Sequence, residues 1–445
     1  MHLPTLAEHE IIMTLVALAL LLAGAYLLGT LFERLKAPRV VGEILGGLLF
    51  GGTFLAHFFP GAMNAVFAAY PEEGKVLNIF YQLGLIFLMF LSGYNTKIEV
   101  DRKNSRLITF LFIGATVLPM AGACPFIRVF RDAYIGTIGN EVSFALVFTI
   151  GVAITSIPVI SKIFFDMGIM NTRFSNTVLT ASTLQDLLLW ILLNAATRIA
   201  TTGEVRFWEM VVVVAITLGL FVVVKLVSDH AKTLKVNLKP INFYSVSFVI
   251  LLLVCAGLYT VGINIMYAAF LTGYVVKAIA GVDDTVQGLM DNLGNFAFSF
   301  FIPIYFALVG IQLNLLNNFS WLRFLAFFAI AFTLEAVGTL IMVQFTDLNR
   351  ASKLNFAVTM NARGGPGIVL ATVAYSYNII SLEFFTVLIL TTMLSSLIAG
   401  YWLRVQQKKD PDIFMNLTKA PKEAVAEVSA SNGSDGSNDP GDANE

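Results

Sequence analysis

This sequence has few charged residues. Asp, Glu, Lys and Arg make up 13% of its 445 residues, whereas about 25% is usual for a soluble domain. Hydrophobic residues make up 57%. A chain with so little charge cannot cover a globular core with polar side chains, which argues against a soluble protein. The formal net charge of −1 offers no positive excess for a nucleic-acid partner, and we expect none.

Cysteine and histidine are also scarce. The two cysteines, Cys124 and Cys255, lie in separate apolar runs, so we interpret them as small packing residues and not as a disulfide or a metal pair. The four histidines lie in loops or near the ends of apolar runs. His9-Glu10 has no second histidine at the spacing of a zinc protease. We therefore predict neither an intramembrane enzyme nor a cofactor.

Long apolar runs recur along most of the chain. A helix needs about 20 mainly apolar residues to cross a bilayer, and open sheet edges cannot face lipid. The sequence therefore predicts an all-α polytopic membrane protein with about thirteen transmembrane helices. The predicted spans are 11–32, 40–59, 76–95, 107–127, 142–165, 175–197, 207–228, 244–262, 265–281, 290–313, 320–345, 354–378 and 383–404.

The basic residues set the predicted orientation. With the N-terminus outside, the inner loops hold nineteen lysines and arginines and the outer loops hold six, as the positive-inside rule requires. Residues 1–10 then form an extracytoplasmic segment, and residues 11–405 form the transmembrane domain. Residues 406–445 are mostly small and polar, which indicates a disordered cytoplasmic tail.

Two spans contain helix-breaking residues at matching positions. Thirteen spans divide into six, one and six, so the two six-helix halves would be inverted repeats, a plan found in secondary transporters. The fifth span of the first half contains Thr155-Ser156-Ile157-Pro158, and its counterpart contains Asn361-Ala362-Arg363-Gly364-Gly365-Pro366-Gly367. A single proline could simply kink a helix. Two breaks at symmetric positions instead favour a pair of crossing broken helices beside a transport site.

Several motifs, in order along the chain, resemble the monovalent cation:proton antiporter-2 family, the sodium/proton and potassium/proton exchangers. These motifs are Pro38–Gly47, Leu83–Gly93, Thr155–Val159, Gln185-Asp186 and Asn361–Gly365. Gln-Asp resembles the potassium-efflux branch of this family. Electrogenic sodium exchangers tend to have Asp-Asp there and a lysine roughly where this chain has Glu335.

The resemblance implies an architecture that spacing alone does not show. It implies a homodimer in which each chain has a scaffold domain, here residues 11–95 and 207–313. It also implies a mobile core domain, here residues 107–197 and 320–404, that slides like an elevator while it carries the ion. We expect an integral protein of a prokaryotic inner membrane, with Na⁺ or K⁺, H⁺ and membrane lipid as its partners.

Asp186 is the main candidate for the ion and proton site. It lies in the otherwise apolar stretch 180–197, and an acid at bilayer depth usually marks an ion or proton path. No basic residue shares its span, which argues against a structural salt bridge. Burial disfavours the charged form of a carboxyl group, so either a proton or a monovalent cation could neutralise Asp186. Gln185 cannot titrate, and with one titrating acid we predict electroneutral exchange.

Other polar residues complete the predicted site. Thr155 and Ser156 offer hydroxyl oxygens to an alkali cation, although such side chains often bond to their own helix instead. We expect Asp186 and Thr155 to be the main cation ligands. Glu335 and Arg363 are expected to form a structural charge pair in the core, with Glu335 as a second proton carrier left as an alternative. Asn361 is a further candidate for lining the site.

The sequence leaves some alternatives open. Gln185 and Glu335 depart from the sodium-exchanger pattern, so a proton-coupled exporter of an organic substrate on the same fold remains a second hypothesis. A channel fits less well, because a carboxylate that binds cation and proton in competition suits a carrier. The choice between Na⁺ and K⁺ depends on cavity size and ligand number, which the sequence does not reveal.

Overall fold

The computed structural model describes residues 5–95, 104–170, 172–204, 240–280, 284–316 and 319–417, with a few positions between 208 and 219. Within these residues every element is a helix, apart from one isolated antiparallel bridge between Ile135 and Ile380. The all-α class predicted from the sequence is confirmed. The predicted span 207–228 and residues 418–445 of the tail lie outside, or almost entirely outside, the described part.

The helices follow the predicted spans closely, and each span apart from 207–228 overlaps at least one of them. Residues up to 204 form α1 (Glu8–Arg34), α2 (Arg39–Leu48), α3 (Leu55–Phe58), α4 (Pro60–Phe67), α5 (Glu73–Asn95), α6 (Ser105–Phe112), the π-helix η1 (Ile113–Val117), α7 (Leu118–Tyr134), α8 (Glu141–Val152), α9 (Ile157–Asp166) and α10 (Arg173–Thr202). Residues from 240 onward form α12 (Pro240–Thr260), α13 (Ile265–Ala280), α14 (Asp284–Ser299), α15 (Phe301–Gln312), α16 (Trp321–Val343), α17 (Arg350–Met360), α18 (Gly365–Ser376) and α19 (Leu382–Lys409).

Nine helices in the described part of the chain are long and apolar enough to cross a membrane. The span predicted at 40–59 differs from the prediction, because α2 ends at Leu48. Gly51 and Gly52 are poor helix formers, and the chain turns there. Thr53 then accepts the backbone N–H of Leu315 at 3.1 Å and donates to the carbonyl of Leu313 at 2.9 Å, which ties the turn to the end of α15. The total of thirteen spans and the inverted repeats stay predictions.

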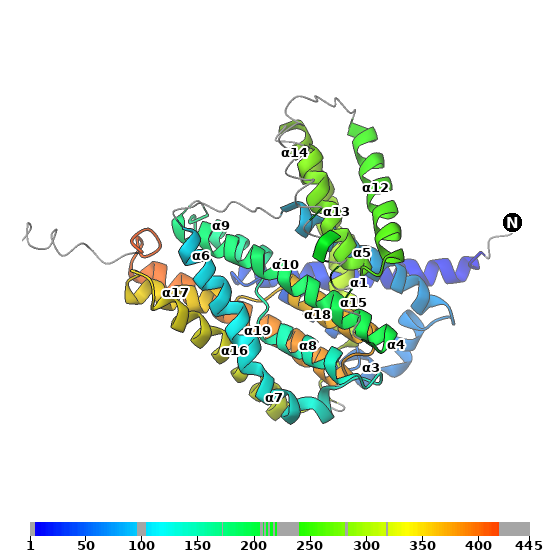
Figure 1. The fold of residues 1–445 in the computed structure, drawn as a ribbon. Helices are drawn as coiled ribbons and strands as arrows, with labels where there is room; N and C mark the ends of the chain where they lie inside the picture. Colours follow the sequence, from blue (N-terminus) through cyan, green and yellow to red (C-terminus); the bar gives the residue numbers. More distant parts are fainter. Residues whose placement is uncertain are drawn as a thin grey trace, which may run out of the picture.

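The helices pack as two groups. In the first group α1, α2, α5, α13 and α15 make their most extensive contacts with one another, and α12 and α14 join them. In the second group α6 to α10 pack against α16 to α19. Figure 1 shows α6, α7 and α16 on the opposite side of the molecule from α12 and α14. We call these sets the α1 group and the α10 group.

Polar contacts join the two groups inside the molecule. The hydroxyls of Tyr305 on α15 and Thr372 on α18 lie 3.1 Å apart. The backbone N–H of Asn264, just before α13, donates to Oδ1 of Asn194 on α10 at 2.6 Å. The division into a scaffold domain and a mobile core domain stays a prediction.

Aromatic rings and the end of the chain hold the α10 group together. Tyr134 of α7 stacks on Phe384 of α19 with ring centroids 4.5 Å apart. At the other end of this group, the segment after α19 folds back over it. The backbone N–H of Asn349 donates to the carbonyl of Leu417 at 2.9 Å, and the buried Phe414 ring lies 5.0 Å from that of Phe174. The last described residues are therefore part of the α10 group.

Candidate functional site

The first helix break lies between α8 and α9. Helix α8 ends at Val152, and Ser156 caps α9 by accepting the backbone N–H of Val159 at 3.5 Å. Pro158 lies in the first turn of α9, where its missing N–H leaves no helix bond unmade. The sequence therefore ends one helix and starts another within a single predicted span.

The second break lies between α17 and α18 and touches the first. Helix α17 ends at Met360, and α18 starts at Gly365 with a proline in its first turn. A Cβ atom on Gly364 would lie 2.4 Å from Cγ2 of Val159 and 2.5 Å from Oγ of Ser156. No larger residue fits there without movement, so glycine allows the two breaks to meet.

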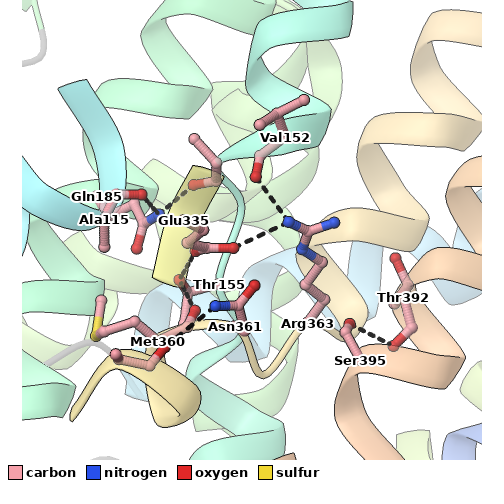
Figure 2. Close-up of polar contacts among 12 residues, drawn as sticks. Ala115, Val152, Thr155, Gln185, Glu335, Met360, Asn361, Arg363, Thr392 and Ser395 are labelled. Atoms are coloured by element: carbon pink, nitrogen blue, oxygen red, sulfur yellow. Dashed lines mark hydrogen bonds and ion pairs between the residues drawn. The ribbon is translucent and has the colours of Figure 1, made fainter. Parts of the chain in front are cut away.

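Hydrogen bonds between the breaks satisfy backbone groups that each break frees. The backbone N–H of Ser156 donates to the carbonyl of Ala362 at 2.8 Å. The Thr155 hydroxyl lies 2.6 Å from the carbonyl of Met360 and 3.1 Å from Oε1 of Glu335 (Figure 2). Its single proton can serve one of these acceptors at a time. Irregular backbone at this depth is tolerated because it is buried in protein and bonded.

Glu335 and Arg363 form a buried ion pair. Nη2 of Arg363 lies 2.9 Å from Oε2 of Glu335, and their side chains are 1% and 0% exposed. The same nitrogen donates to the carbonyl of Val152 at 2.7 Å (Figure 2). Val152 ends α8, and a cation is favourable at the C-terminus of a helix. The structure thus brings together the two residues expected to pair, at the two breaks.

Gln185 is anchored through its amide nitrogen. Nε2 donates to the carbonyl of Ala115 at 3.2 Å and to that of Ala153, the residue just after α8. Ala115 lies in the π-helix η1, and Pro119 four residues later has no N–H to donate to its carbonyl. The Gln185 amide therefore supplies a hydrogen bond to the Ala115 carbonyl that the helix cannot supply. Gln185 also lies beside Glu335 (Figure 2).

Asp186 differs from these residues. It is 2% exposed, and neither of its carboxylate oxygens has a hydrogen-bond partner in the described part of the chain. Its helix, α10, packs against α6, α8, α9 and α17. Asn361 donates to the carbonyl of Ala357 at 3.1 Å, while its own Oδ1 has no partner among the described residues. Buried polar groups are nearly always bonded, so these atoms have hydrogen-bonding capacity for a ligand or a water molecule.

Sequence reasoning missed three hydroxyl residues near the breaks. Ser182 lies one turn before Asp186 on α10, so both side chains share one face of the helix. Its buried Oγ, like that of Thr116 in η1, has no partner within the described residues. Ser396 of α19 donates to the carbonyl of Arg363 and so supports the second break. Ser182 could have been found from the sequence, because it lies four residues before Asp186 in the apolar stretch 180–197.

A cavity of about 580 Å³ approaches the breaks from one end of the molecule. It lies between the two helix groups, where α1, α9 and α19 end. Pro158 and Val159 of α9 and Gly365 of α18 line it, and Asp186 does not. The first turns after both breaks therefore face this cavity, while the carboxylate of Asp186 is closed off from it.

Comparisons with known proteins agree with this geometry. Residues 17–407 match the family described as "Sodium/hydrogen exchanger, transmembrane". The chain is 23% identical over 408 residues to the Na⁺/H⁺ antiporter NhaS4 of Synechocystis, covering 88% of this chain and 96% of that protein. It is 24% identical over 383 residues to the K⁺/H⁺ antiporter 1 of Saccharomyces cerevisiae, covering 82% of this chain and 43% of the yeast protein. It spans a similar fraction, 44%, of the cation/H⁺ antiporter 15 of Arabidopsis thaliana, to which it is 22% identical over 82% of its own length.

A solved structure shares the fold. The sodium proton antiporter MjNhaP1 of Methanocaldococcus jannaschii superposes with a TM-score of 0.58 at 15% identity, covering 92% of this chain and 99% of that one. The resemblance predicted from the motifs is confirmed at the level of monovalent cation:proton antiporters. The predictions of a membrane-embedded protein and of a protein that is not an enzyme are confirmed with it. The chain belongs to the transmembrane sodium/hydrogen exchanger family, whose members are transporters.

Proposed function

We propose that this protein exchanges a monovalent cation, Na⁺ or K⁺, for H⁺, and that the cation and the proton compete for Asp186. The observation that carries the proposal is the contrast between two buried acids. Glu335 is paired with Arg363, whereas Asp186 has no partner within the described residues. Named relatives include both a Na⁺/H⁺ and a K⁺/H⁺ antiporter, which supports this substrate class.

The chemistry follows from the cost of a bare buried charge. An ionised carboxylate without a partner is strongly unfavourable in a low-dielectric interior. Either a proton or one alkali cation removes that penalty, so Asp186 binds the cation in one direction of transport and the proton in the other. Oxygen atoms suit a hard cation. Thr155, Ser156, Ser182 and Asn361 supply candidate oxygens beside or near the breaks, and the positive ends of α9 and α18 tolerate the acid between ions.

The stoichiometry follows from the pairing. Gln185 cannot titrate, and the Glu335–Arg363 pair stays neutral as a unit when a cation or a proton is bound at Asp186. One proton therefore replaces one monovalent cation, and the exchange is electroneutral. If Glu335 also took up a proton, its negative charge would be lost and Arg363 would be left buried and uncompensated, which is costly.

The movement we propose is an elevator. The α10 group carries Asp186 past the α1 group, which serves as the scaffold and dimer interface. In the orientation with the N-terminus outside and the C-terminus in the cytoplasm, the cavity between the groups lies at their inner end. Only neutral, loaded Asp186 crosses, and this rule enforces exchange.

A second function has one observation in its favour. The cavity of about 580 Å³ is far larger than a cation needs. It lies within the range of about 300–1,000 Å³ that small-molecule sites occupy. A proton-coupled exporter of an organic substrate would use that volume and keep Asp186 as its proton carrier.

The test uses purified protein in sealed proteoliposomes with an internal pH dye. An outward proton gradient is imposed, and Na⁺, K⁺, Li⁺ or Rb⁺ is then added outside. We expect one or two of these cations to dissipate the gradient rapidly, with no effect of clamping the membrane voltage. Asp186→Asn should abolish the response, whereas Asp132→Asn, at a side chain 90% exposed, should not. A folded protein that responds to no alkali cation would support the organic-substrate alternative.

A further inference from the structure

The rim of the cavity carries an excess of positive charge. Five basic residues line it, and only two acidic residues do. The basic residues are Lys36, Arg39, Lys162, Arg404 and Lys408, and the acidic residues are Glu33 and Asp166. A basic rim opposes the approach of a cation, because a cleft lined by one sign of charge raises the local concentration of the opposite sign. The rim is therefore suited to an anion rather than to the cation that the exchanger would carry.

Ion pairs compensate three of these five cations. Nε of Arg39 lies 2.8 Å from the buried Glu43. Lys162 lies 2.9 Å from Asp166, and Arg404 lies 3.7 Å from the same acid. The other two, Lys36 and Lys408, form no ion pair with any residue that the structure describes. They are the positive charges still available to a ligand.

Lys36 is held in an unusual backbone conformation. Its φ of +59° lies in the left-handed region, which residues with a side chain seldom adopt. The guanidinium of Arg404 on α19 donates to its carbonyl, so the turn between α1 and α2 is bound to the other helix group. Lys36 and Lys408 thus both line the cavity, one from each group.

The remaining lining is apolar and continues to the outer surface. Val159, Ile163 and Phe306 line the cavity, and Leu35 and Tyr401 at its rim are 67% and 74% exposed. Exposed apolar side chains next to spanning helices face lipid. A molecule that fits this site has an anionic head for the two lysines and an apolar chain that can slide in from the bilayer.

We propose that this cavity binds one anionic phospholipid from the inner leaflet. Its phosphate lies between Lys36 and Lys408, and an acyl chain lies along Val159, Ile163 and Phe306. Because the two lysines belong to different helix groups, the lipid bridges these groups at their inner end. The site is separate from Asp186, and lipid binding does not depend on the exchange proposed above.

Native mass spectrometry of the full chain in detergent tests this site. Phosphatidylglycerol and phosphatidylcholine of equal chain length are titrated separately, and the bound lipid is counted. We expect one phosphatidylglycerol to be retained preferentially. A lysine near a membrane surface contributes about fivefold in affinity for an anionic lipid, so the double variant Lys36→Gln/Lys408→Gln should weaken binding about 25-fold.

The matched control is Lys353→Gln/Lys409→Gln. It removes two basic residues at the same end of the molecule that do not line the cavity, and it should leave lipid retention unchanged. Equal loss in both double variants would mean general surface attraction and would overturn the site. Equal retention of the two lipids, or displacement of the lipid by inorganic phosphate alone, would also overturn it, the latter in favour of a soluble anion.

Discussion

Gln185 and Asp186 are consecutive residues of α10 with opposite hydrogen bonding. The Gln185 amide nitrogen donates to two carbonyls, from Ala115 and Ala153, whereas neither oxygen of Asp186 has a partner within the described residues. One residue therefore fastens α10 to the neighbouring helices, and its neighbour is free for a ligand. This contrast separates structural effects from transport effects in the variants below.

Thermal stability should distinguish the two neighbours. Gln185→Ala removes a donor from two buried carbonyls, and unmade bonds of this kind cost about 1–3 kcal/mol, so this variant should melt at a lower temperature. Asp186→Asn removes an uncompensated acid and should leave the melting temperature in detergent unchanged or higher. If Asp186→Asn lowered the melting temperature as much as Gln185→Ala does, Asp186 would have a structural partner.

Competition at one site predicts a specific pH dependence. As the pH on the cation side falls, more of Asp186 is protonated and less is open to the cation. The apparent KM for the cation should then rise, by about tenfold per pH unit once the protonated form predominates, while the maximal rate stays constant. Initial exchange rates over a matrix of cation and proton concentrations check this. A maximal rate that falls with pH at constant KM would contradict competition.

The ion pair between Glu335 and Arg363 should show strong coupling. Arg363→Met leaves a buried carboxylate uncompensated, and breaking such a pair costs about 3–5 kcal/mol. The free energy of unfolding lost in the double variant Glu335→Met/Arg363→Met should be smaller than the sum of the losses in the two single variants. A double-mutant cycle on denaturation free energies measures this. The exposed pair Lys162–Asp166 provides the comparison, because exposed pairs contribute about 0–1 kcal/mol.

Two adjacent glycines provide a matched test of the contact between the breaks. Gly364→Ala would place Cβ 2.4 Å from Val159, so the two breaks would have to separate. Gly365→Ala would meet only Leu88, at 3.9 Å, which is ordinary contact. We expect Gly364→Ala to lose most exchange activity and several degrees of melting temperature, and Gly365→Ala to keep both. Similar behaviour of the two variants would show that contact at Gly364 is dispensable.

Thr155 combines a structural bond with a proposed ligand role. Thr155→Val removes the donor to Met360 and Glu335, at a cost of about 1–3 kcal/mol. Thr155→Ser keeps the hydroxyl and should restore stability. If the hydroxyl also binds the cation, Thr155→Val raises the KM and Thr155→Ser does not. Exchange assays at several cation concentrations separate these effects, and an unchanged KM in Thr155→Val would remove Thr155 from the ligand set.

Local chemistry explains which parts of this structure were predictable. Pro158 and the glycine-rich run after Asn361 cannot continue a helix, so both breaks could be placed from the sequence. The bond from Ser156 to Ala362 joins residues about 200 positions apart, and no local pattern encodes it. The pairing of Glu335 with Arg363 could be predicted because buried charges seek partners.

Other features depended on packing and could not be predicted. Gly51 and Gly52 are a local signal for the early end of α2, but the contacts that tie this turn to the end of α15 through Thr53 are not encoded locally. The π-helix η1, which presents Ala115 to Gln185, requires a neighbouring helix to use the carbonyl. That Ser182 has no hydrogen-bond partner among the described residues is visible only once its neighbours have been placed.

The return of the chain over the α10 group has a practical consequence. Phe414 is buried against Phe174, and Leu417 accepts the backbone N–H of Asn349. A fluorophore at the exposed Met415, within the same segment, is therefore attached to the helices that carry Asp186, and one at Asn95 is attached to the other group. Energy transfer between these two labels would follow the proposed displacement during turnover, one molecule at a time, without any change to the ion site.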